Sequence, residues 1–326
     1  MLQVSRAPGP ERPLDLTSPV VDQVAADPAP ATGTGRLATR IGGFVALTKP
    51  RIIELLLVAT LPTMVVAARG LPGWRLALAT LGGGALAAGG ANAFNMVVDR
   101  DIDAVMRRTS KRPLVTGLVS PPEAMVFAFA LEVAAFAELW WAVNLLSALL
   151  AVSATLFYVF VYTIWLKRTS TQNIVIGGAA GAVPVLVGWS AVTGRLALAP
   201  VVLFFVIFLW TPPHFWALAV RYSDDYRAAE VPMLPAVKPI AATARQIVVY
   251  TAALWATSLV FVPVGHMGWI YLGASIVLGA VFMVFALALL RDRSTATAMR
   301  TFHFSITYLT LLFVSMAVDV LVRHHW

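Results

Sequence analysis

The 326-residue chain contains no cysteine, and only 12% of its residues are charged. The absence of cysteine excludes disulfide bonds, iron–sulfur clusters and thiolate nucleophiles. Soluble domains usually carry about 25% charged residues, whereas 59% of this chain is hydrophobic and its mean hydropathy is +0.80. Because a soluble fold cannot bury that much apolar surface, we expect lipid to be the solvent of this chain.

The first 40 residues lack a hydrophobic stretch and are rich in Pro, Ala, Gly and Thr. This composition predicts a disordered cytoplasmic tail over residues 1–40, without a secretory signal peptide, followed by one membrane domain over residues 41–326. A mitochondrial transit peptide is poor in acidic residues, but this tail contains Glu11, Asp15, Asp22 and Asp27. We therefore expect a bacterial plasma membrane.

Apolar runs of about 18 residues or more, each long enough to cross a hydrocarbon core of about 30 Å, recur along the rest of the chain. They predict an all-α fold, a polytopic membrane protein with nine transmembrane helices around a central cavity. The predicted spans are residues 51–69, 76–98, 121–141, 143–165, 173–193, 198–220, 244–263, 268–290 and 301–322.

The 24 Lys and Arg residues are unevenly divided between the two sides of these spans. Most precede the first span or lie between spans 2 and 3, 4 and 5, 6 and 7, and 8 and 9. The other side holds only Arg69, Arg75, Arg195 and Arg323. By the positive-inside rule, we expect a cytoplasmic N-terminus and a C-terminus outside. The two most charged loops, 2/3 and 6/7, are four spans apart, which suggests two parallel four-helix repeats with a ninth helix appended.

Oxygen-bearing side chains recur every fourth residue where the second predicted span ends. Asn95, Asp99 and Asp103 share one helix face, because residues four apart are offset by only about 40°. Carboxylates placed near lipid cost about 2.5–3.5 kcal/mol each and repel one another. Mg²⁺ offsets both penalties and keeps positions for water or phosphate oxygens. The pattern favours a metal site, although such charges can also simply end a span in a solvated loop.

Basic residues gather on the same predicted side of the membrane. Their number is typical of a site for a polyanion such as a diphosphate, although each one alone could be an ordinary interfacial anchor. A second acidic pair, Asp224 and Asp225, occupies the equivalent loop 6/7, where a helix cap or turn is the alternative. The basic residues are Lys49, Arg51, Arg107, Arg108, Lys111, Arg112, Lys167 and Arg168.

The sixth predicted span contains Trp210-Thr-Pro212-Pro213-His214-Phe-Trp216. Two consecutive prolines remove two backbone donors, so we expect the helix to be disturbed there. His214 would project from that break, to bind iron or a propionate, or only to hydrogen-bond a freed carbonyl. The other four histidines, including His303, are interpreted as background, and the intramembrane Glu132 is a functional candidate without an assigned role.

With these stretches, the sequence resembles the UbiA superfamily of intramembrane prenyltransferases. Asn95, Asp99 and Asp103 match its first motif, Asn-x-x-x-Asp-x-x-x-Asp. The branch that farnesylates heme is the most similar, on the stretch from Trp210 to Trp216 and on four others. These are residues 99–114, 162–168, 173–178 and 224–235.

Three features depart from the pattern of that branch. Glu230 stands where glycine is usual, and Val185 stands where a second proline is common. The adjacent Asp224 and Asp225 lack the four-residue spacing of the superfamily's second motif, so the sequence does not say which of them contacts metal.

The resemblance implies Mg²⁺-dependent transfer of farnesyl from farnesyl diphosphate to a vinyl group of heme B. It implies that heme B is a substrate without covalent attachment, that no nucleic acid takes part, and that a downstream heme A synthase would be a partner. The metal-binding and catalytic residues would be Asn95, Asp99, Asp103, Asp224 and Asp225. The diphosphate-binding residues would be Arg51, Arg108, Lys111, Arg112, Tyr162, Lys167 and Arg168, and the heme-binding residues would be His214, Trp210 and Trp216.

Two alternatives stay open at the level of sequence. The first is a sister prenyltransferase that uses the same metal site but acts on an aromatic or quinone precursor. The second is a transporter for heme or an anionic lipid, because transporters also use basic mouths and broken helices.

Overall fold

The computed structural model describes residues 33–325, except the side chains of residues 33–36, 51, 52 and 54–56. The chain divides into two units, Met1–Ala38 and Thr39–Trp326. The described part of the first unit is the beginning of helix α1 (Gly33–Thr48). Most of the predicted disordered tail, residues 1–32, lies outside the described residues, and its last part, residues 33–40, is helical.

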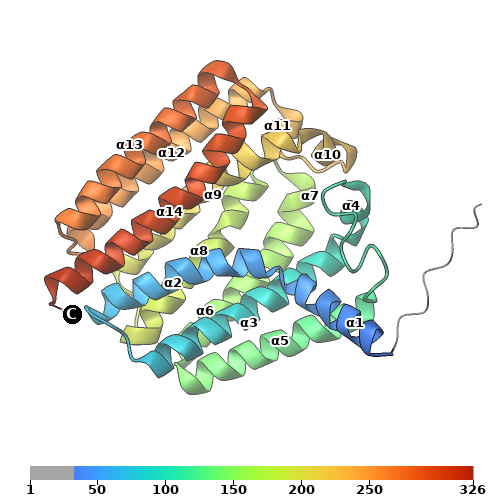
Figure 1. Ribbon diagram of the computed structural model, residues 1–326, viewed down its shortest axis with the longest axis horizontal. Coiled ribbons are helices and arrows are strands. Elements are labelled where there is room, and N and C mark those ends of the chain that lie inside the picture. Colours follow the sequence, from blue (N-terminus) through green and yellow to red (C-terminus); the bar gives the residue numbers. More distant parts are fainter. Residues whose placement is uncertain (1–32, 326) are drawn as a thin grey trace, which may run out of the picture. The chain divides into compact units, whose positions relative to one another are not determined.

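The described chain is all-α, as the sequence predicts (Figure 1). Among the described residues, eight helical stretches are long and apolar enough to span a membrane, and each overlaps a predicted span, with ends that differ by at most six residues. They are α3 (Trp74–Val98), α5 (Pro121–Ala142), the stretch Leu145–Thr169, α8 (Asn173–Thr193), α9 (Leu198–Arg221), α12 (Ile240–Val264), α13 (Trp269–Asp292) and α14 (Thr295–Arg323).

The remaining predicted span, residues 51–69, coincides with α2 (Pro50–Ala68). Its apolar stretch Leu57–Ala68 is shorter than the eight others, within the residues described. The predicted central cavity stays a prediction at this level, because helix positions alone do not define a cavity.

Within the unit Thr39–Trp326, the helices pack in two groups that meet at α2, α8 and α9. Helix α3 lies along α5, and α9 lies between α8 and α12. Helix α2 contacts both α8 and α14. The largest core cluster joins α2, α8, α9, α12, α13 and α14 around buried aromatic residues such as Phe261, Phe282 and Tyr308.

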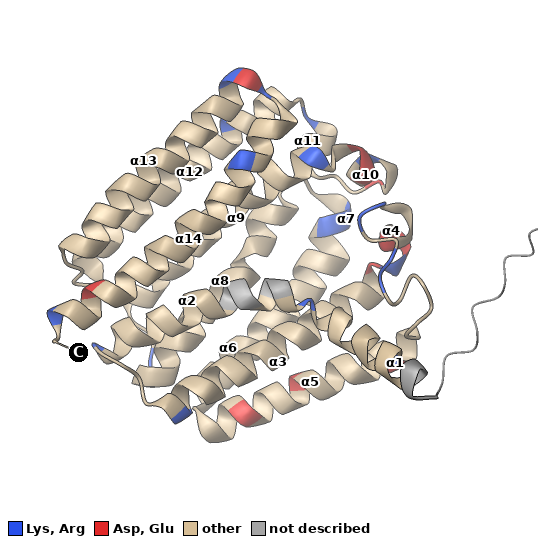
Figure 2. Cartoon of the chain, in the orientation of Figure 1, with Lys and Arg blue, Asp and Glu red and all other residues tan. Residues whose placement is uncertain are grey.

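Charged residues gather at one end of these helices, while the helix shafts are almost free of charge (Figure 2). Three short helices lie at that end: α4 (Arg100–Val105), α10 (Ser223–Ala228) and α11 (Leu234–Val237). Helix α4 follows α3 and α10 follows α9, so the two acidic segments do lie at the same end. Loops 2/3 and 6/7 therefore meet at one end of the helices, as their predicted placement requires.

The stretch Leu145–Thr169 changes its helical geometry midway. It consists of α6 (Leu145–Leu156), a π-helix η1 (Phe157–Leu166) and the short α7 (Lys167–Thr169). The wider turn lets the Thr163 hydroxyl donate to the carbonyl oxygen of Tyr158, five residues earlier, at 2.8 Å. Such wide turns are rare and often occur at functional sites, and this one ends directly at Lys167.

The predicted disturbance of the sixth span is wrong. Helix α9 runs without interruption from Leu198 to Arg221, with Pro212 and Pro213 inside it. The helix is buried on most sides by α8, α12 and α14. Packing by neighbouring helices therefore allows the helix to continue, despite the two donors that the prolines remove.

Asp319 secures the opposite end of the helices. Its carboxylate is 1% exposed and accepts backbone N–H bonds from Gly268 at 2.6 Å, Ile270 at 3.1 Å and Tyr271 at 3.3 Å. These donors belong to the first turn of α13 or directly precede it, where helical N–H groups lack partners. Asp319 thereby ties α13 to α14.

We expect Asp319→Ala to lower the free energy of unfolding by about 2–4 kcal/mol, because it leaves these buried N–H donors without an acceptor. Thermal unfolding of the purified protein in detergent measures the effect. Val322→Ala, at a lipid-facing position that is 58% exposed on the same helix, is the control. Equal melting temperatures for the two variants would contradict the assigned role.

Candidate active site

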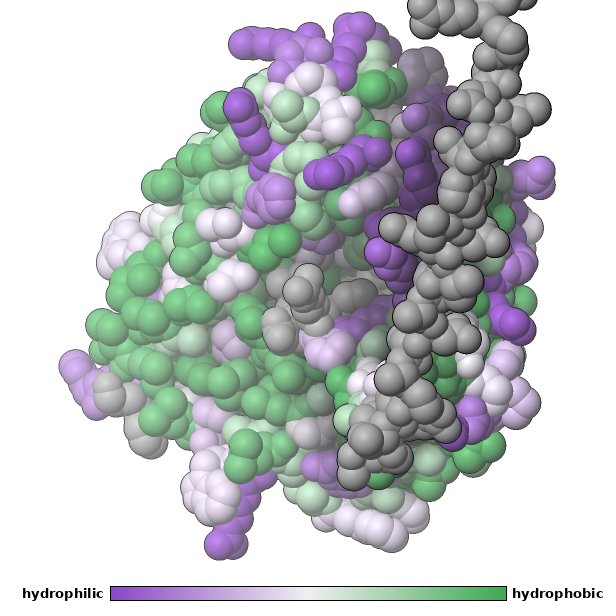
Figure 3. All heavy atoms as spheres, turned by 45° about the vertical axis from the view of Figure 1, so that its right-hand side comes forward, coloured by the Kyte–Doolittle hydropathy of each residue, from purple (hydrophilic) through white to green (hydrophobic). Residues whose placement is uncertain are grey.

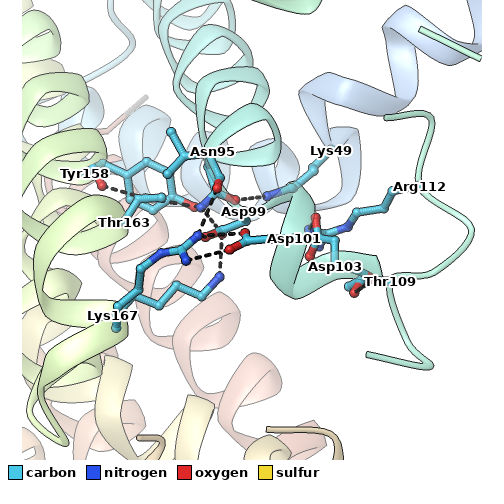
Figure 4. A network of polar contacts seen from close by, with 12 residues as sticks. Lys49, Asn95, Asp99, Asp101, Asp103, Thr109, Arg112, Tyr158, Thr163 and Lys167 are labelled. Carbon is cyan, nitrogen blue, oxygen red and sulfur yellow. Dashed lines mark hydrogen bonds and ion pairs between the residues drawn. The ribbon is translucent and has the colours of Figure 1, made fainter. Parts of the chain in front are cut away.

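The buried carboxylate of Asp99 lies at the centre of a polar network between α2, α3 and η1 (Figure 4). Asp99 is fully buried, and its Oδ2 accepts a hydrogen bond from the Asn95 amide at 2.6 Å and another from the Lys167 ammonium. The Asn95 amide nitrogen also donates to Thr163 at 3.2 Å. Its oxygen accepts from Lys49 at 2.8 Å.

The ends of two helices bring these side chains together. Proline disfavours a right-handed helical conformation at the residue before it, so α1 ends at Thr48 and Lys49 takes a left-handed φ of 53° before Pro50. Helix α3 ends at Val98, and Asp99 forms its C-cap. The ammonium of Lys49 therefore meets the last turn of α3.

The other oxygen of Asp99 has no hydrogen-bond partner among the described residues. The guanidinium of Arg168 lies 4.0 Å from this Oδ1. An unpaired buried carboxylate oxygen is costly, so this position suits a cation. It is the clearest mark of a ligand-binding function in the network.

Asp103 pairs with Arg112, whereas Asp99 pairs with Lys167. The carboxylate of Asp103 is 2% exposed and forms an ion pair with Arg112 at 2.5 Å. The negative charges of Asp99 and Asp103 act to raise the pKa of Lys49. Burial and the neighbouring cations Arg112 and Lys167 outweigh this effect and lower the pKa of Lys49 to about 7.

Arg168 is held in place by Asp101, on the exposed side of α4. Its guanidinium donates two hydrogen bonds of 2.8 Å to the Asp101 carboxylate and one of 2.9 Å to the carbonyl of Val98. The Arg168 hydrogen bond lowers the pKa of Asp101 to about 2. The pair is therefore fully ionised at neutral pH, and Arg168 stays beside Asp99.

The second acidic pair is split between a buried and an exposed position. The side chain of Asp225 is 8% exposed, whereas that of Asp224 is 78% exposed and pairs with Arg227 of its own helix at 2.6 Å. Asp225 accepts from the Arg107 side chain at 3.1 Å and from the Arg108 backbone N–H at 3.4 Å. The loop after α4 therefore bridges both acidic segments, through Arg112 to Asp103 and through Arg107 to Asp225.

Apolar packing reinforces this bridge. Ile102 and Met106 of the first segment belong to the same buried cluster as Tyr226, Val231 and Met233 of the second. The guanidinium of Arg108 lies over the ring of Tyr222, 5.5 Å from its centroid. The two segments thus form one cover at this end of the helices.

The predicted diphosphate-binding residues are found at three kinds of position. Arg112, Lys167 and Arg168 belong to the network just described, whereas Arg108 and Lys111 are exposed. Tyr162 stacks on Tyr158 with ring centroids 5.3 Å apart, and an ideal side chain at Gly177 of α8 would collide with the Tyr162 ring. The side chain of Arg51 lies outside the described residues.

The predicted heme-binding residues are enclosed by helix packing. His214 is 7% exposed, stacks on Trp210 at 4.2 Å, and its Nδ1 lies 2.7 Å from the Ser305 hydroxyl of α14. Trp210 donates to the carbonyl of Ser305 at 2.7 Å. Trp216 is 1% exposed and lies in the cluster beneath the cover. Their role towards heme stays a prediction.

The sequence patterns miss three parts of the network. Lys49, noted only as one of several cations at the mouth, binds the motif's own Asn95. Thr163 and Tyr158 belong to an apolar span, and only the π-helical turn brings the Thr163 hydroxyl to Asn95. A lysine before a proline at a span's start is a weak signal, and nothing in the sequence marks the wide turn.

The oxygen atoms of this network suit Mg²⁺, but they do not by themselves form a complete coordination sphere. Among the side chains that the structure describes, no group of three or more His, Cys, Asp or Glu is arranged to hold a metal ion. The buried Asp99 oxygen without a partner, the Asn95 amide oxygen and the Asp103 carboxylate are hard oxygen ligands, and Mg²⁺ usually takes only one or two carboxylates, together with phosphate oxygens and water. These residues therefore fit an ion that arrives with a phosphorylated ligand.

Comparison with known sequences adds the context of this site. The model of the UbiA prenyltransferase family matches residues 56–314. The protoheme IX farnesyltransferase of Paenarthrobacter aurescens is 53% identical over 296 residues, which cover 89% of this chain and 92% of that protein. That of Frankia alni is 52% identical over 288 residues, which cover 87% and 99%.

Solved structures show the same fold at low sequence identity. A digeranylgeranylglyceryl phosphate synthase has a TM-score of 0.72 and 16% identity, covering 87% of this chain and 99% of that one. A UbiA homolog from Archaeoglobus fulgidus bound to DMAPP and Mg²⁺ has a TM-score of 0.60 and 17% identity, covering 84% and 99%. The fold of this chain is therefore UbiA-like.

The contrast between the two adjacent aspartates leads to a direct test. We expect Asp225→Asn to lower turnover by about tenfold or more, because it weakens the buried contacts that join the cover to the first acidic segment. Asp224→Asn, on the exposed side of the same helix, should stay within about threefold of the wild type. Steady-state turnover of the two purified variants measures this difference. A larger loss of turnover in Asp224→Asn than in Asp225→Asn would refute the role assigned to Asp225.

Proposed function

The chain belongs to the UbiA prenyltransferase family, and from this membership we propose that it transfers the farnesyl group of farnesyl diphosphate to a vinyl group of heme B, which gives heme O. The observation that carries the reaction type is the fully buried Asp99, with a free oxygen among cations at the mouth of a membrane protein. The acceptor is supported by the curated relatives, which are named protoheme IX farnesyltransferases.

Asn95, Asp99 and Asp103 would hold Mg²⁺, with Asp225 as the candidate from the second segment. When bound, this ion supplies positive charge that stabilises the departing diphosphate. The homologue from A. fulgidus bound DMAPP and Mg²⁺ together, which supports the same pairing of donor and ion here.

The protein's own cations supply the rest of the donor site. Lys49, Lys167 and Arg112 neutralise the motif's oxygens, and Arg168 stands beside them. With Mg²⁺ held by the carboxylates, these basic side chains would be free to donate to the phosphate oxygens. Charge-assisted hydrogen bonds of this kind strengthen as negative charge grows on the leaving group.

The proposed reaction breaks the allylic C–O bond of the donor and leaves its electron pair on the diphosphate. The π electrons of a heme vinyl group then form the new C–C bond to the allylic carbon. A water oxygen bonds to the cationic carbon left on heme and loses one proton, which completes a hydroxyethylfarnesyl group. Apolar side chains around the C15 tail would keep other water from the allylic cation.

The donor site is proposed to open on the cytoplasmic side of a bacterial plasma membrane. The uneven distribution of Lys and Arg supports this orientation, with the C-terminus outside. Association with a downstream heme A synthase remains part of the same proposal, because a membrane-bound product has to reach the enzyme that modifies it next.

The purified protein, incubated with heme B, farnesyl diphosphate and Mg²⁺, should form heme O, identified by its mass. A farnesylated aromatic acid or quinone precursor, with heme unchanged, would favour the sister prenyltransferase. Movement of heme or lipid across proteoliposomes, without release of diphosphate, would favour a transporter. Either outcome would refute the proposed reaction.

Two carboxylates from neighbouring turns give a matched pair of variants. Asp99→Asn removes the buried charge at the centre of the network, so we expect turnover to fall by about a thousandfold or more, as for other losses of transition-state charge stabilisation. Asp101→Asn weakens only the exposed ion pair with Arg168, so we expect turnover to fall by no more than about tenfold. Heme O formation measures both, and retained activity in Asp99→Asn membranes would disprove the metal assignment.

A further inference from the structure

Helix α8 begins with a buried amide that has no hydrogen-bond partner. The side chain of Asn173 is 0% exposed, and neither its amide nitrogen nor its amide oxygen forms a hydrogen bond among the described residues. Of the buried side chains in the described part of the chain, it is the only one with two unpaired polar atoms. Burying an amide without hydrogen bonds is costly, so its presence requires a physical reason.

The packing of α8 does not need an amide at this position. The backbone N–H of Asn173 already donates to the carbonyl of Ser170 at 3.3 Å, and no side chain caps the start of the helix. The next two residues, Ile174 and Val175, belong to the apolar cluster beneath the cover. For packing alone, a leucine of similar size would therefore suffice.

The side chain of Asn173 lies on the face of α8 that contacts η1. Gly177 follows four residues later on this face, and a side chain built there would collide with the Tyr162 ring. Helix α8 runs back along η1, so one turn from this contact towards the charged end leads to Asn173 on one side and to Lys167 on the other. Because Lys167 binds Asp99, Asn173 lies level with the Asp99 network.

Helix α2 contacts α8 further from the charged end. An ideal side chain at Gly188 would meet the carbonyl oxygen of Thr60 at 2.8 Å. Both helices run away from the charged end, so the undescribed side chains of residues 51–56 lie level with residues 179–184 of α8. At a rise of about 1.5 Å per residue, this is about 9 Å or more beyond Asn173.

We propose that the Asn173 amide binds the diphosphate of the prenyl donor, with Nδ2 donating to a phosphate oxygen beside Asp99. This inference rests on the proposed function and adds a binding residue to its donor site. Asp99 Oδ1 and the Asn173 amide are buried polar groups without partners at the same level of the molecule. They suit two parts of one ligand, because the carboxylate oxygen attracts a divalent cation and the amide N–H attracts a phosphate oxygen.

A neutral donor suits this position better than another basic side chain. The site already contains Lys167, Arg168 and Arg112, each paired with an aspartate. A further buried cation would repel these three and would need a counter-ion in the ligand-free protein. An unpaired amide costs much less than an unpaired charge, so Asn173 can wait for its ligand.

The surface provides an approach for a phosphorylated ligand at this end of the helices. Beside the apolar face of the protein, the surface towards α4 and α10 is hollowed and lined by hydrophilic residues (Figure 3). Helix α4 directly follows Asp99. The hollow therefore lies on the side from which a diphosphate would reach Asp99.

Calorimetric titration of the purified full-length protein in nanodiscs with inorganic diphosphate and Mg²⁺ tests the proposal. Asn173→Leu keeps the size of the side chain and removes both polar atoms. We expect the affinity to fall by about tenfold or more, as for the loss of a hydrogen bond to a charged group. Gln172→Leu, at the exposed neighbouring position, should bind as the wild type does.

The melting temperature of the ligand-free protein distinguishes a ligand-binding amide from a structural one. Because Asn173 has no partner among the described residues, Asn173→Leu should melt at the wild-type temperature or above it. The increase in melting temperature caused by Mg²⁺ and diphosphate should be smaller in the variant than in the wild type. A lower melting temperature of the ligand-free variant would show that a buried water or a protein group holds the amide, and would overturn the proposal.

The same titration separates this inference from the proposed function. If the wild type binds diphosphate with Mg²⁺ and Asn173→Leu binds it equally well, the role of Asn173 is refuted and the proposed function stands. If the wild type does not bind diphosphate with Mg²⁺, the proposed function is refuted, and this inference with it.

Discussion

A carboxylate buried beside lipid has to be neutralised, and this constraint shapes the charged end of the molecule. Asp99 is fully buried, so its charge is removed from bulk solvent and needs partners in the protein. The protein surrounds it with Asn95, Lys49 and Lys167 and leaves one oxygen without a hydrogen bond. The network is therefore satisfied only in part, and a divalent cation with a phosphorylated ligand can complete it.

Each piece of the site depends on the point where a helix ends. Pro50 stops α1 and turns Lys49 inward, Asp99 caps α3, and the π-helical turn of η1 ends at Lys167. The cover formed by α4, α10 and their loops closes over these ends through Asp225 and an apolar cluster. The same basic side chains neutralise the carboxylates now and would neutralise the expected diphosphate. Binding of the prenyl diphosphate should therefore rearrange these side chains without leaving a buried charge unpaired.

Most of the fold could be predicted from sequence because a membrane span is a one-dimensional signal. Hydropathy located each of the eight long apolar helices of the described residues but not α1, and the spacing of Asn95 and Asp99 predicted their contact. Side-chain partners depend on three-dimensional packing and were harder to predict. Asp103 pairs with Arg112, a partner that the sequence did not identify, and the prolines in α9 do not interrupt the helix. The role of Lys49 also required the structure, since only its contact with Asn95 distinguishes it from an ordinary interfacial residue.

The central claim is that Asp99 and its neighbours bind the donor only together with a divalent cation. The most direct measurement is calorimetric titration of the wild-type protein in nanodiscs with a non-hydrolysable farnesyl diphosphate analogue, with and without Mg²⁺. The account predicts that removing Mg²⁺ weakens binding by about a hundredfold or more, because Asp99 then repels the incoming phosphates. Equal affinity under both conditions would contradict it.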